Sequence, residues 1–416
     1  MSARAVLLLY LLFLLLERAG QTVLSALNLA HIRKNADSVP GPLRDAVDAE
    51  TYRKSVLYSL EKNRFALLEG WITSLAMVAA VVSGLLGALD AAMGRLPLPP
   101  SLRGTLFVLA VFLAAEALSL PFSVFATFRI EARFGFNRTT PGLFVADLLK
   151  GWAVALVLGV PLLLGLFWFV DRAGTFWWLY AFAAFSAFQL ILAVLWPLVI
   201  APLFNRFSPL PDGALRERIE ALAAATGFRS RGIFVMDAGK RSRHGNAYFT
   251  GLGRVRRIVL FDTLVESMDQ EEALAILAHE IGHEKMGHVK TRLAVSVASG
   301  FLGFAALGLL LPWAPFYAAF GFAAPGPQAL LVIAALCSGP VLFPLTPLSS
   351  TWSRRQEYAA DRFSARAMGS GAGLRSALVR LARENLTNLS PHPWYGFFHY
   401  SHPTVQERIA ALDRCH

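Results

Sequence analysis

The sequence predicts a mainly α-helical, polytopic membrane protein that also carries a small α+β part in water. Its 416 residues are 55% hydrophobic and only 16% charged, whereas soluble domains average about 25% charged residues. The mean hydropathy is +0.50, and several apolar stretches reach the length of about 20 residues that crosses a bilayer. Two polar segments, one between the fifth and sixth apolar stretches and one after the last, contain helical or strand patterns. These patterns favour a folded aqueous part.

Seven apolar segments are long enough to be membrane helices. The first has an alternative interpretation, because its uninterrupted apolar core, 5–16, is short enough for the hydrophobic region of a signal peptide. Glu17 and Arg18 follow in place of a small-residue cleavage site, so we expect a retained span. The predicted spans are 6–29, 66–89, 105–125, 151–170, 176–200, 293–313 and 329–348.

Lys and Arg residues set the predicted orientation. The connections after spans one, three, five and seven are basic, whereas the alternate connections carry few Lys or Arg residues. Every basic segment therefore falls on one side, which the positive-inside rule makes cytoplasmic. This explains the net charge of +11. The chain shows no nucleic-acid-binding module, so we expect a lipid bilayer as a partner and no nucleic acid.

By composition the chain divides into 1–204 with five spans, 205–292 as a first polar block, 293–350 with two spans, and 351–416 as a polar tail. In the first block we expect an amphipathic helix near 213–226, stopped by Gly227. Strands are expected at 232–236, 246–249 and 257–261, with a turn at 251–253. A helix from about 269 to 290 follows, begun by a capping box of Asp269 and Glu272.

This last helix contains His279-Glu280-Ile281-Gly282-His283. Four residues advance a helix by about 400°, so the two histidines point the same way, one turn apart. Two neutral imidazoles so placed can bind one tetrahedral Zn²⁺, while Glu280 can accept a proton from a water molecule at the metal. The pentapeptide alone is also compatible with an exposed helix that carries these residues by chance. His288 lies about 500° from His283, so we expect it to face away and to be structural.

A hydrolytic zinc site with two histidines needs a third protein ligand and an open position. The tail after the seventh span contains Glu357 and Asp361, again four apart on one helical face. Glu357 could bind the metal while Asp361 accepts a hydrogen bond from the distal nitrogen of a ligand histidine. A solvated charged face explains the same spacing, and the spacing does not decide between the two.

Several stretches outside the pentapeptide resemble one known family in composition and in order. They are Phe-Gly-Phe-Asn-Arg-Thr-Thr at 134–140, Pro-Leu-Phe-Asn-Arg-Phe at 202–207, the segment from 246 to 264, the helix at 279–288, 357–361, and Ser-His-Pro at 401–403 with Glu407 and Arg408. Together they resemble the type I integral-membrane CAAX prenyl protease family, within the gluzincin zinc metallopeptidases. The resemblance covers roughly residues 50–416.

The resemblance implies roles for the matching residues. His279, His283 and Glu357 would be the ligands of one zinc ion per chain. Glu280 would be the general base and then the proton donor to the leaving amine. His402 would stabilise the oxyanion of the tetrahedral intermediate. By its position alone, His402 is simply a residue before a proline at a helix start.

The same resemblance implies supporting residues. Asp361 would orient a ligand histidine, and Arg408 would orient the same shell. Asn246, Ala247 and Tyr248 would form an edge strand whose backbone aligns an extended substrate by strand addition. By its position alone, this segment is a strand preceded by a turn residue.

The implied architecture is a seven-helix transmembrane barrel around a water-filled chamber, with a small α+β zinc metallopeptidase domain on the cytoplasmic side. The implied activity is that of a zinc metalloendopeptidase acting on a peptide or protein, with C-terminal processing of prenylated Cys-a-a-X substrates as the family's reaction. The Arg-rich chain with short loops favours a bacterial inner membrane; in a eukaryote we would expect the ER membrane. General protein prenylation is not expected in bacteria, so an unprenylated substrate stays open.

Two other functions are compatible with parts of the sequence. A membrane-protein quality-control zinc protease of the four-span type shares the zinc motif but predicts fewer spans. A non-catalytic, zinc-dependent binding or transport protein would not need Glu280 beside an open metal position. The sequence does not indicate an oligomeric state.

Overall fold

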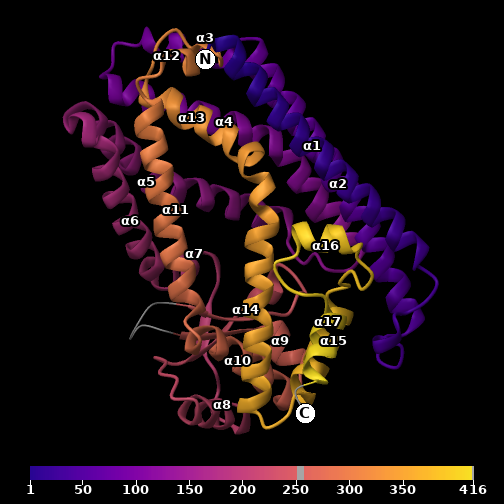
Figure 1. Cartoon of the computed structure of the whole chain (residues 1–416). Helices are drawn as coiled ribbons and strands as arrows, with labels where there is room; N and C mark the ends of the chain where they lie inside the picture. The colour runs from indigo at the N-terminus through magenta and orange to yellow at the C-terminus, as the bar shows by residue number, and fades with distance from the viewer. Residues whose placement is uncertain (251–256, 415–416) are drawn as a thin grey trace.

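The computed structural model describes residues 1–250 and 257–414, so the predicted turn at 251–253 lies outside the described residues. The described chain is mainly helical and contains one four-stranded sheet (Figure 1). Seven helical stretches are long and apolar enough to cross a membrane, which confirms the predicted number. They are Ala3–Lys34, Ala49–Val82, Pro100–Glu131, Pro141–Arg172, Gly174–Phe204, His288–Leu310 and Pro327–Ala367.

Four of the seven stretches are single helices, α1 (Ala3–Lys34), α2 (Ala49–Val82), α5 (Pro141–Arg172) and α11 (His288–Leu310). The others combine elements. These are α4 (Pro100–Phe125) with the π-helix η2 (Ala126–Glu131); η3 (Gly174–Phe176), α6 (Trp177–Leu195), the π-helix η4 (Trp196–Ile200) and α7 (Ala201–Phe204); and α13 (Pro327–Leu342), η7 (Phe343–Leu345) and α14 (Thr346–Ala367). Two short helices, α3 (Leu85–Gly94) and α12 (Ala314–Ala318), connect spans.

The second span is shifted relative to its prediction. We predicted 66–89, but α2 ends at Val82 and a separate helix, α3, starts at Leu85. Gly84 between them has a φ of 71°, in the left-handed region that glycine adopts without strain. An apolar composition alone does not show such a break, because α3 is as hydrophobic as the span before it.

The connections between spans gather alternately at the two ends of the molecule. Ile32 and Leu43, around the first connection, pack with Leu389 and Ile409 of the C-terminal part. At the other end the Gln328 side chain donates a hydrogen bond to Asp90 at 3.0 Å. In Figure 1 the chain starts at the upper end, and α8, α10, α15 and α17 gather at the lower end. The connections predicted to be basic therefore lie at the end that holds the sheet.

The aqueous part follows the predicted order of elements. The predicted amphipathic helix is α8 (Ala214–Ala225), and Gly227 after it has a φ of 63°. The predicted strands are β2 (Ile233–Met236), β3 (Ala247–Thr250) and β4 (Arg257–Phe261). A fourth strand, β1 (Phe207–Pro209), was not predicted; it is short and contains a proline, which is tolerated at a sheet edge.

The sheet order is β1-β2-β4-β3. β1 and β2 are antiparallel, β2 and β4 are parallel, and β3 pairs antiparallel with β4. Within the described residues β3 is thus an edge strand. The core below the sheet is formed by apolar side chains that include Ile219, Leu260 and Leu277. The remaining helices of this part are α9 (Asp262–Ser267), α10 (Gln270–Lys285), α15 (Ala372–Glu384), α16 (Pro393–His399) and α17 (Val405–Leu412).

Helix α10 is the predicted motif helix and begins at the predicted capping box of Asp269 and Glu272. It ends at Lys285 rather than near 290, because Gly287 has a left-handed φ of 73° and α11 starts at His288. α10 packs against β3, α14 and α15. At Gly282 the approach of α14 is so close that a Cβ atom would lie 3.2 Å from the Cα atom of Ala360.

The predicted domain boundaries at 292 and 350 fall inside helices. α11 and α14 run from the apolar spans into the aqueous part without a break. The division of the chain into membrane and aqueous segments by composition remains a prediction. In the structure, the two continuous helices α11 and α14 connect the spans directly to the elements that surround α10.

Candidate metal centre

Helix α14 presents a row of polar residues to the aqueous part. Their spacing of three and four residues places them on one face of the helix. Four of them are buried, with exposed fractions of 7% or less. Buried polar side chains normally have hydrogen-bond partners, so we expect partners for these four. The row consists of Ser350, Arg354, Glu357, Asp361 and Ser364.

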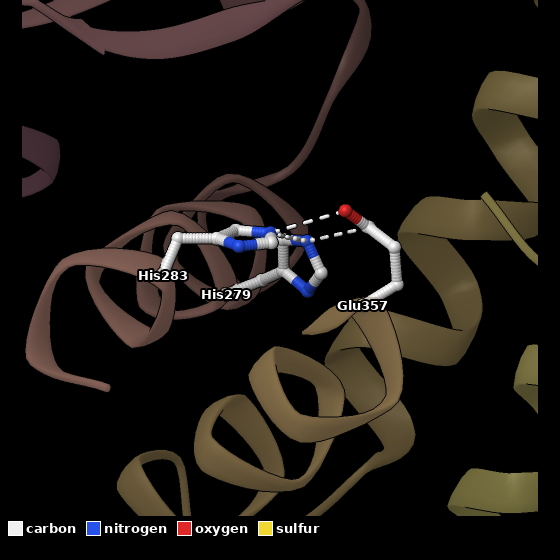
Figure 2. Close-up of side chains that lie close together, drawn as sticks. All are labelled: His279, His283 and Glu357. Carbon is white, nitrogen blue, oxygen red and sulfur yellow. Dashed lines mark hydrogen bonds and ion pairs between the residues drawn. The ribbon is translucent and has the colours of Figure 1, made fainter. Parts of the chain in front are cut away.

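The centre of the row meets the two histidines of α10. The Nε2 atoms of His279 and His283 lie 3.2 Å apart, and each lies 3.3 Å from an oxygen of Glu357. Figure 2 shows both imidazoles from α10 and the carboxylate from α14 converging on one point. These residues form a group that could hold a metal ion. The prediction that Glu357 belongs with the histidines therefore has the geometry it requires.

Burial and hydrogen bonds set the electrostatics of this group. His279 is 6% exposed and Glu357 is 2% exposed. Burial disfavours the charged form of His279, but hydrogen bonds to Asp361 and Glu357 outweigh burial and raise its pKa. Burial also raises the pKa of Glu280, next to the first histidine. A divalent cation would compensate the buried carboxylate of Glu357.

Asp361 and Arg408 support His279 from behind. The Nδ1 atom of His279 lies 2.8 Å from Oδ1 of Asp361. Arg408 on α17 donates to both oxygens of Asp361, from Nε at 2.9 Å and from Nη2 at 2.5 Å. Asp361 thus fixes which ring nitrogen of His279 faces Glu357, and Arg408 fixes Asp361. These contacts are compatible with the roles that the resemblance implied for both residues, which stay predictions.

His283 has its own partner, and here the sequence-based expectation was wrong. We expected His288 to face away, but its Nδ1 atom lies 3.0 Å from Nδ1 of His283. The argument assumed a continuous helix, whereas the chain turns at Gly287. Each histidine of the motif therefore has a hydrogen-bonding group at the ring nitrogen that points away from Glu357. The glycine before His288 was the signal in the sequence that could have indicated the turn.

His402 approaches the same group from the segment between α16 and α17. Its Nε2 atom lies 3.5 Å from Oε1 of Glu357, and its Nδ1 atom lies 2.9 Å from the hydroxyl of Ser401. The His402 side chain is 63% exposed, so a substrate in the site can reach it. Glu280, by contrast, is partly buried on α10.

The segment 246–248 lies at the sheet edge beside α10. Ala247 and Tyr248 are in β3, paired with Leu260 and Val259 of β4, and Asn246 precedes them and accepts a backbone hydrogen bond from Phe261. β3 packs against α10, the helix that carries the two histidines, and within the described residues it pairs on one side only. An extended peptide can hydrogen-bond to such an edge.

Comparison with known proteins identifies the chain's relatives. A model described as "CAAX prenyl protease N-terminal, five membrane helices" matches residues 28–206, and one described as "Peptidase family M48" matches residues 209–416. The chain belongs to peptidase family M48. It is therefore a multi-pass membrane metalloendopeptidase that acts on peptides or proteins.

Individual members of family M48 match over most of their length. The chain is 35% identical to a CAAX prenyl protease 1 homolog of Oryza sativa, covering 90% of each protein. It is 32% identical to the Homo sapiens CAAX prenyl protease 1 homolog, over 92% of this chain and 90% of the relative. The crystal structure of S. mikatae Ste24p matches 98% of this chain and 99% of that one, at 30% identity and a TM-score of 0.91. This match confirms the predicted fold class of a mainly helical protein with seven apolar helices and a small sheet, whereas the cytoplasmic side of the sheet-containing part stays a prediction.

Proposed function

We propose that this chain is a zinc metalloendopeptidase that removes a C-terminal peptide from prenylated substrates. One observation carries the proposal: His279, His283 and Glu357 come together from two helices with 3.2–3.3 Å between the facing atoms. A tetrahedral zinc ion with ligands at about 2.0–2.1 Å requires about 3.3 Å between ligand atoms. Two imidazoles and one carboxylate are also a ligand set of hydrolytic zinc sites.

Bound Zn²⁺ would supply a Lewis acid that polarises the peptide carbonyl and lowers the pKa of a water molecule. Glu280 accepts the proton from the attacking water and delivers it to the leaving amine. His402 donates a hydrogen bond to the oxygen on which negative charge develops. Asp361, Arg408 and His288 hold the ligand histidines in place.

The substrate would bind as an added strand on β3. The backbone of Asn246, Ala247 and Tyr248 would align the peptide next to α10, so that its scissile bond lies between Glu280 and His402. The names of the relatives support a prenylated Cys-a-a-X substrate. The basic connections at the end that holds the metal centre support a cytoplasmic location for it, in a bacterial inner membrane or in the ER membrane of a eukaryote.

Cleavage of a farnesylated Cys-a-a-X peptide by the detergent-purified protein tests this proposal. The same peptide without the farnesyl group is the matched substrate, and Glu280→Gln is the matched protein. We expect cleavage after the prenylated cysteine, its loss in Glu280→Gln and after chelation, and its return with Zn²⁺. Equal rates for the two peptides would contradict the prenylated substrate class. Failure of the zinc-loaded protein to cleave either peptide would contradict the proposed reaction.

A further inference from the structure

We propose that Arg354 is a positioning residue that holds the segment carrying His402 over the metal centre. This inference rests on the proposed role of His402. Arg354 lies on α14, one turn before Glu357, and is half-buried. It contacts neither the histidines of α10 nor Glu357 in the interactions of the described chain, so its effect on the reaction would pass through another residue.

The guanidinium of Arg354 donates hydrogen bonds to carbonyl groups at the C-terminal end of α16. Its Nη1 atom donates to the carbonyl oxygens of Gly396 at 3.2 Å, Phe397 at 3.3 Å and Tyr400 at 2.7 Å. The last carbonyls of a helix generally lack partners within the helix; of these three, the Gly396 carbonyl also accepts from the backbone N–H of Tyr400. A cation at this end is also favoured by the helix dipole. Arg354 therefore acts as the C-terminal cap of α16.

Further contacts hold the Arg354 guanidinium and the C-terminal end of α16. The Nη2 atom of Arg354 donates to the hydroxyl of Thr351 at 2.8 Å, and the guanidinium lies over the Phe397 ring, 5.6 Å from its centre. The Ser350 hydroxyl donates to the carbonyl of Phe398 at 3.0 Å. Because the planar guanidinium has several donors in fixed directions, it fixes the helix end better than an ammonium group would.

His402 depends on this attachment. It lies two residues beyond Tyr400, in a segment without regular structure between α16 and α17. Its side chain is 63% exposed, so packing around the ring contributes little to its position. The backbone on its N-terminal side is instead tied through Tyr400 to α14. Since α14 also carries Glu357, the same helix sets the distance between His402 and Glu357.

A double-mutant cycle of Arg354→Ala and His402→Ala tests the inference. Loss of an oxyanion donor lowers kcat by about 10²–10³-fold, and we expect this for His402→Ala. Arg354→Ala should lower kcat by about tenfold or more with KM and zinc content unchanged, because the loss is confined to the transition state. In the His402→Ala background, Arg354→Ala should cost less than about twofold, since residues that act as a unit are not additive.

Three variants complete the design. Arg355→Ala, at the exposed neighbouring arginine of α14, is the matched control and should keep the wild-type kcat. Arg354→Lys should recover part of the activity because it keeps a donor and the charge. Ser350→Ala removes a single bond to α16 and should show a smaller kcat loss that also vanishes in the His402→Ala background, which keeps the inference testable if Arg354→Ala does not fold.

Additive losses of kcat in the cycle, or a loss of zinc in Arg354→Ala, would overturn the inference and leave Arg354 as a structural residue. Wild-type kcat in His402→Ala would instead contradict the proposed role of His402. The two failures are therefore distinguishable within one set of proteins.

Discussion

At the scale of single residues, the metal centre is a set of side chains that each have a partner. His279 is backed by Asp361 and His283 by His288, so both imidazoles present Nε2 to Glu357. The proposed roles imply that metal affinity and reactivity depend on different residues. In the proposal, the ligands and their supports determine the affinity, whereas Glu280 and His402 act on the reaction.

Glu280→Gln tests this separation. The amide keeps the size of the side chain but cannot accept a proton, and general acid–base catalysis contributes about 10²–10⁴-fold. We expect kcat to fall by about 10²-fold or more, while the zinc content stays at the wild-type value. Both are measured on the same preparation, by peptide cleavage and by elemental analysis. A variant that loses its zinc would show that Glu280 is part of the binding site instead.

His288→Ala tests the support of His283. Removing an outer partner of a ligand histidine typically weakens metal binding about 10–100-fold, and we expect that loss in a zinc competition titration against a chelator. Lys290→Ala, at an exposed position two residues further along α11, is the control and should bind zinc as the wild type does. Wild-type affinity in His288→Ala would mean that its contact with His283 has no role in binding.

At the scale of elements, α14 organises the site. Along its polar row, Ser350 and Arg354 contact α16, and Glu357 contacts the two histidines. Asp361 accepts from Arg408 of α17. Ser364 donates to the carbonyl of Ala275 in α10 at 2.7 Å. The helix continues the seventh span, so the metal centre is fixed to the membrane part. The contacts of this row with α10 require the two helices to lie close together, and their close approach occurs at Gly282.

Gly282→Ala tests the close approach of the two helices. Alanine is favoured over glycine in a helix by about 1 kcal/mol, but the added Cβ would lie 3.1 Å from Cβ of Phe363 and 3.2 Å from Cα of Ala360. We expect α10 and α14 to move apart and zinc affinity to fall about tenfold or more. Gly142→Ala is the control, because nothing lies within 4 Å of a Cβ there. Unchanged affinity in Gly282→Ala would contradict the importance of this contact.

The sequence predicts those elements whose signals are local. The capping box of Asp269 located the start of α10 correctly, and short runs of strand-forming residues located three of the four strands. The sequence did not predict β1, whose pairing depends on β2, nor the contact between His283 and His288, which depends on the turn at Gly287. The spacing of Arg354 relative to Glu357 was visible, but its carbonyl partners lie 42 to 46 residues away in the chain and come close only in the folded molecule.

At the scale of the whole molecule, the seven spans determine which end carries the metal centre. The basic connections gather at that end, and the positive-inside rule predicts that it faces the cytoplasm. The rule thus predicts that the same residues set membrane insertion and the orientation of the site. The aqueous part joins the membrane part through α11 and α14 without a flexible linker.

Labelling of single cysteines tests the orientation. Arg95, between α3 and α4, and Asp212, before α8, are both exposed and lie at opposite ends. With the native cysteines replaced by serine, we expect Arg95→Cys to react with an impermeant maleimide from outside intact cells. Asp212→Cys should react only after the membrane is opened. The reverse pattern would contradict the cytoplasmic placement.

The central claim is that His279, His283 and Glu357 hold one zinc ion. Its most direct measurement is the zinc content of the purified protein by elemental analysis, beside Glu357→Gln and the surface control Arg355→Ala. We predict about one zinc per chain in the wild type and the control, as expected for a mononuclear hydrolytic site, and a large loss in Glu357→Gln. A folded wild-type protein without zinc, or a Glu357→Gln variant that retains it fully, would contradict the account.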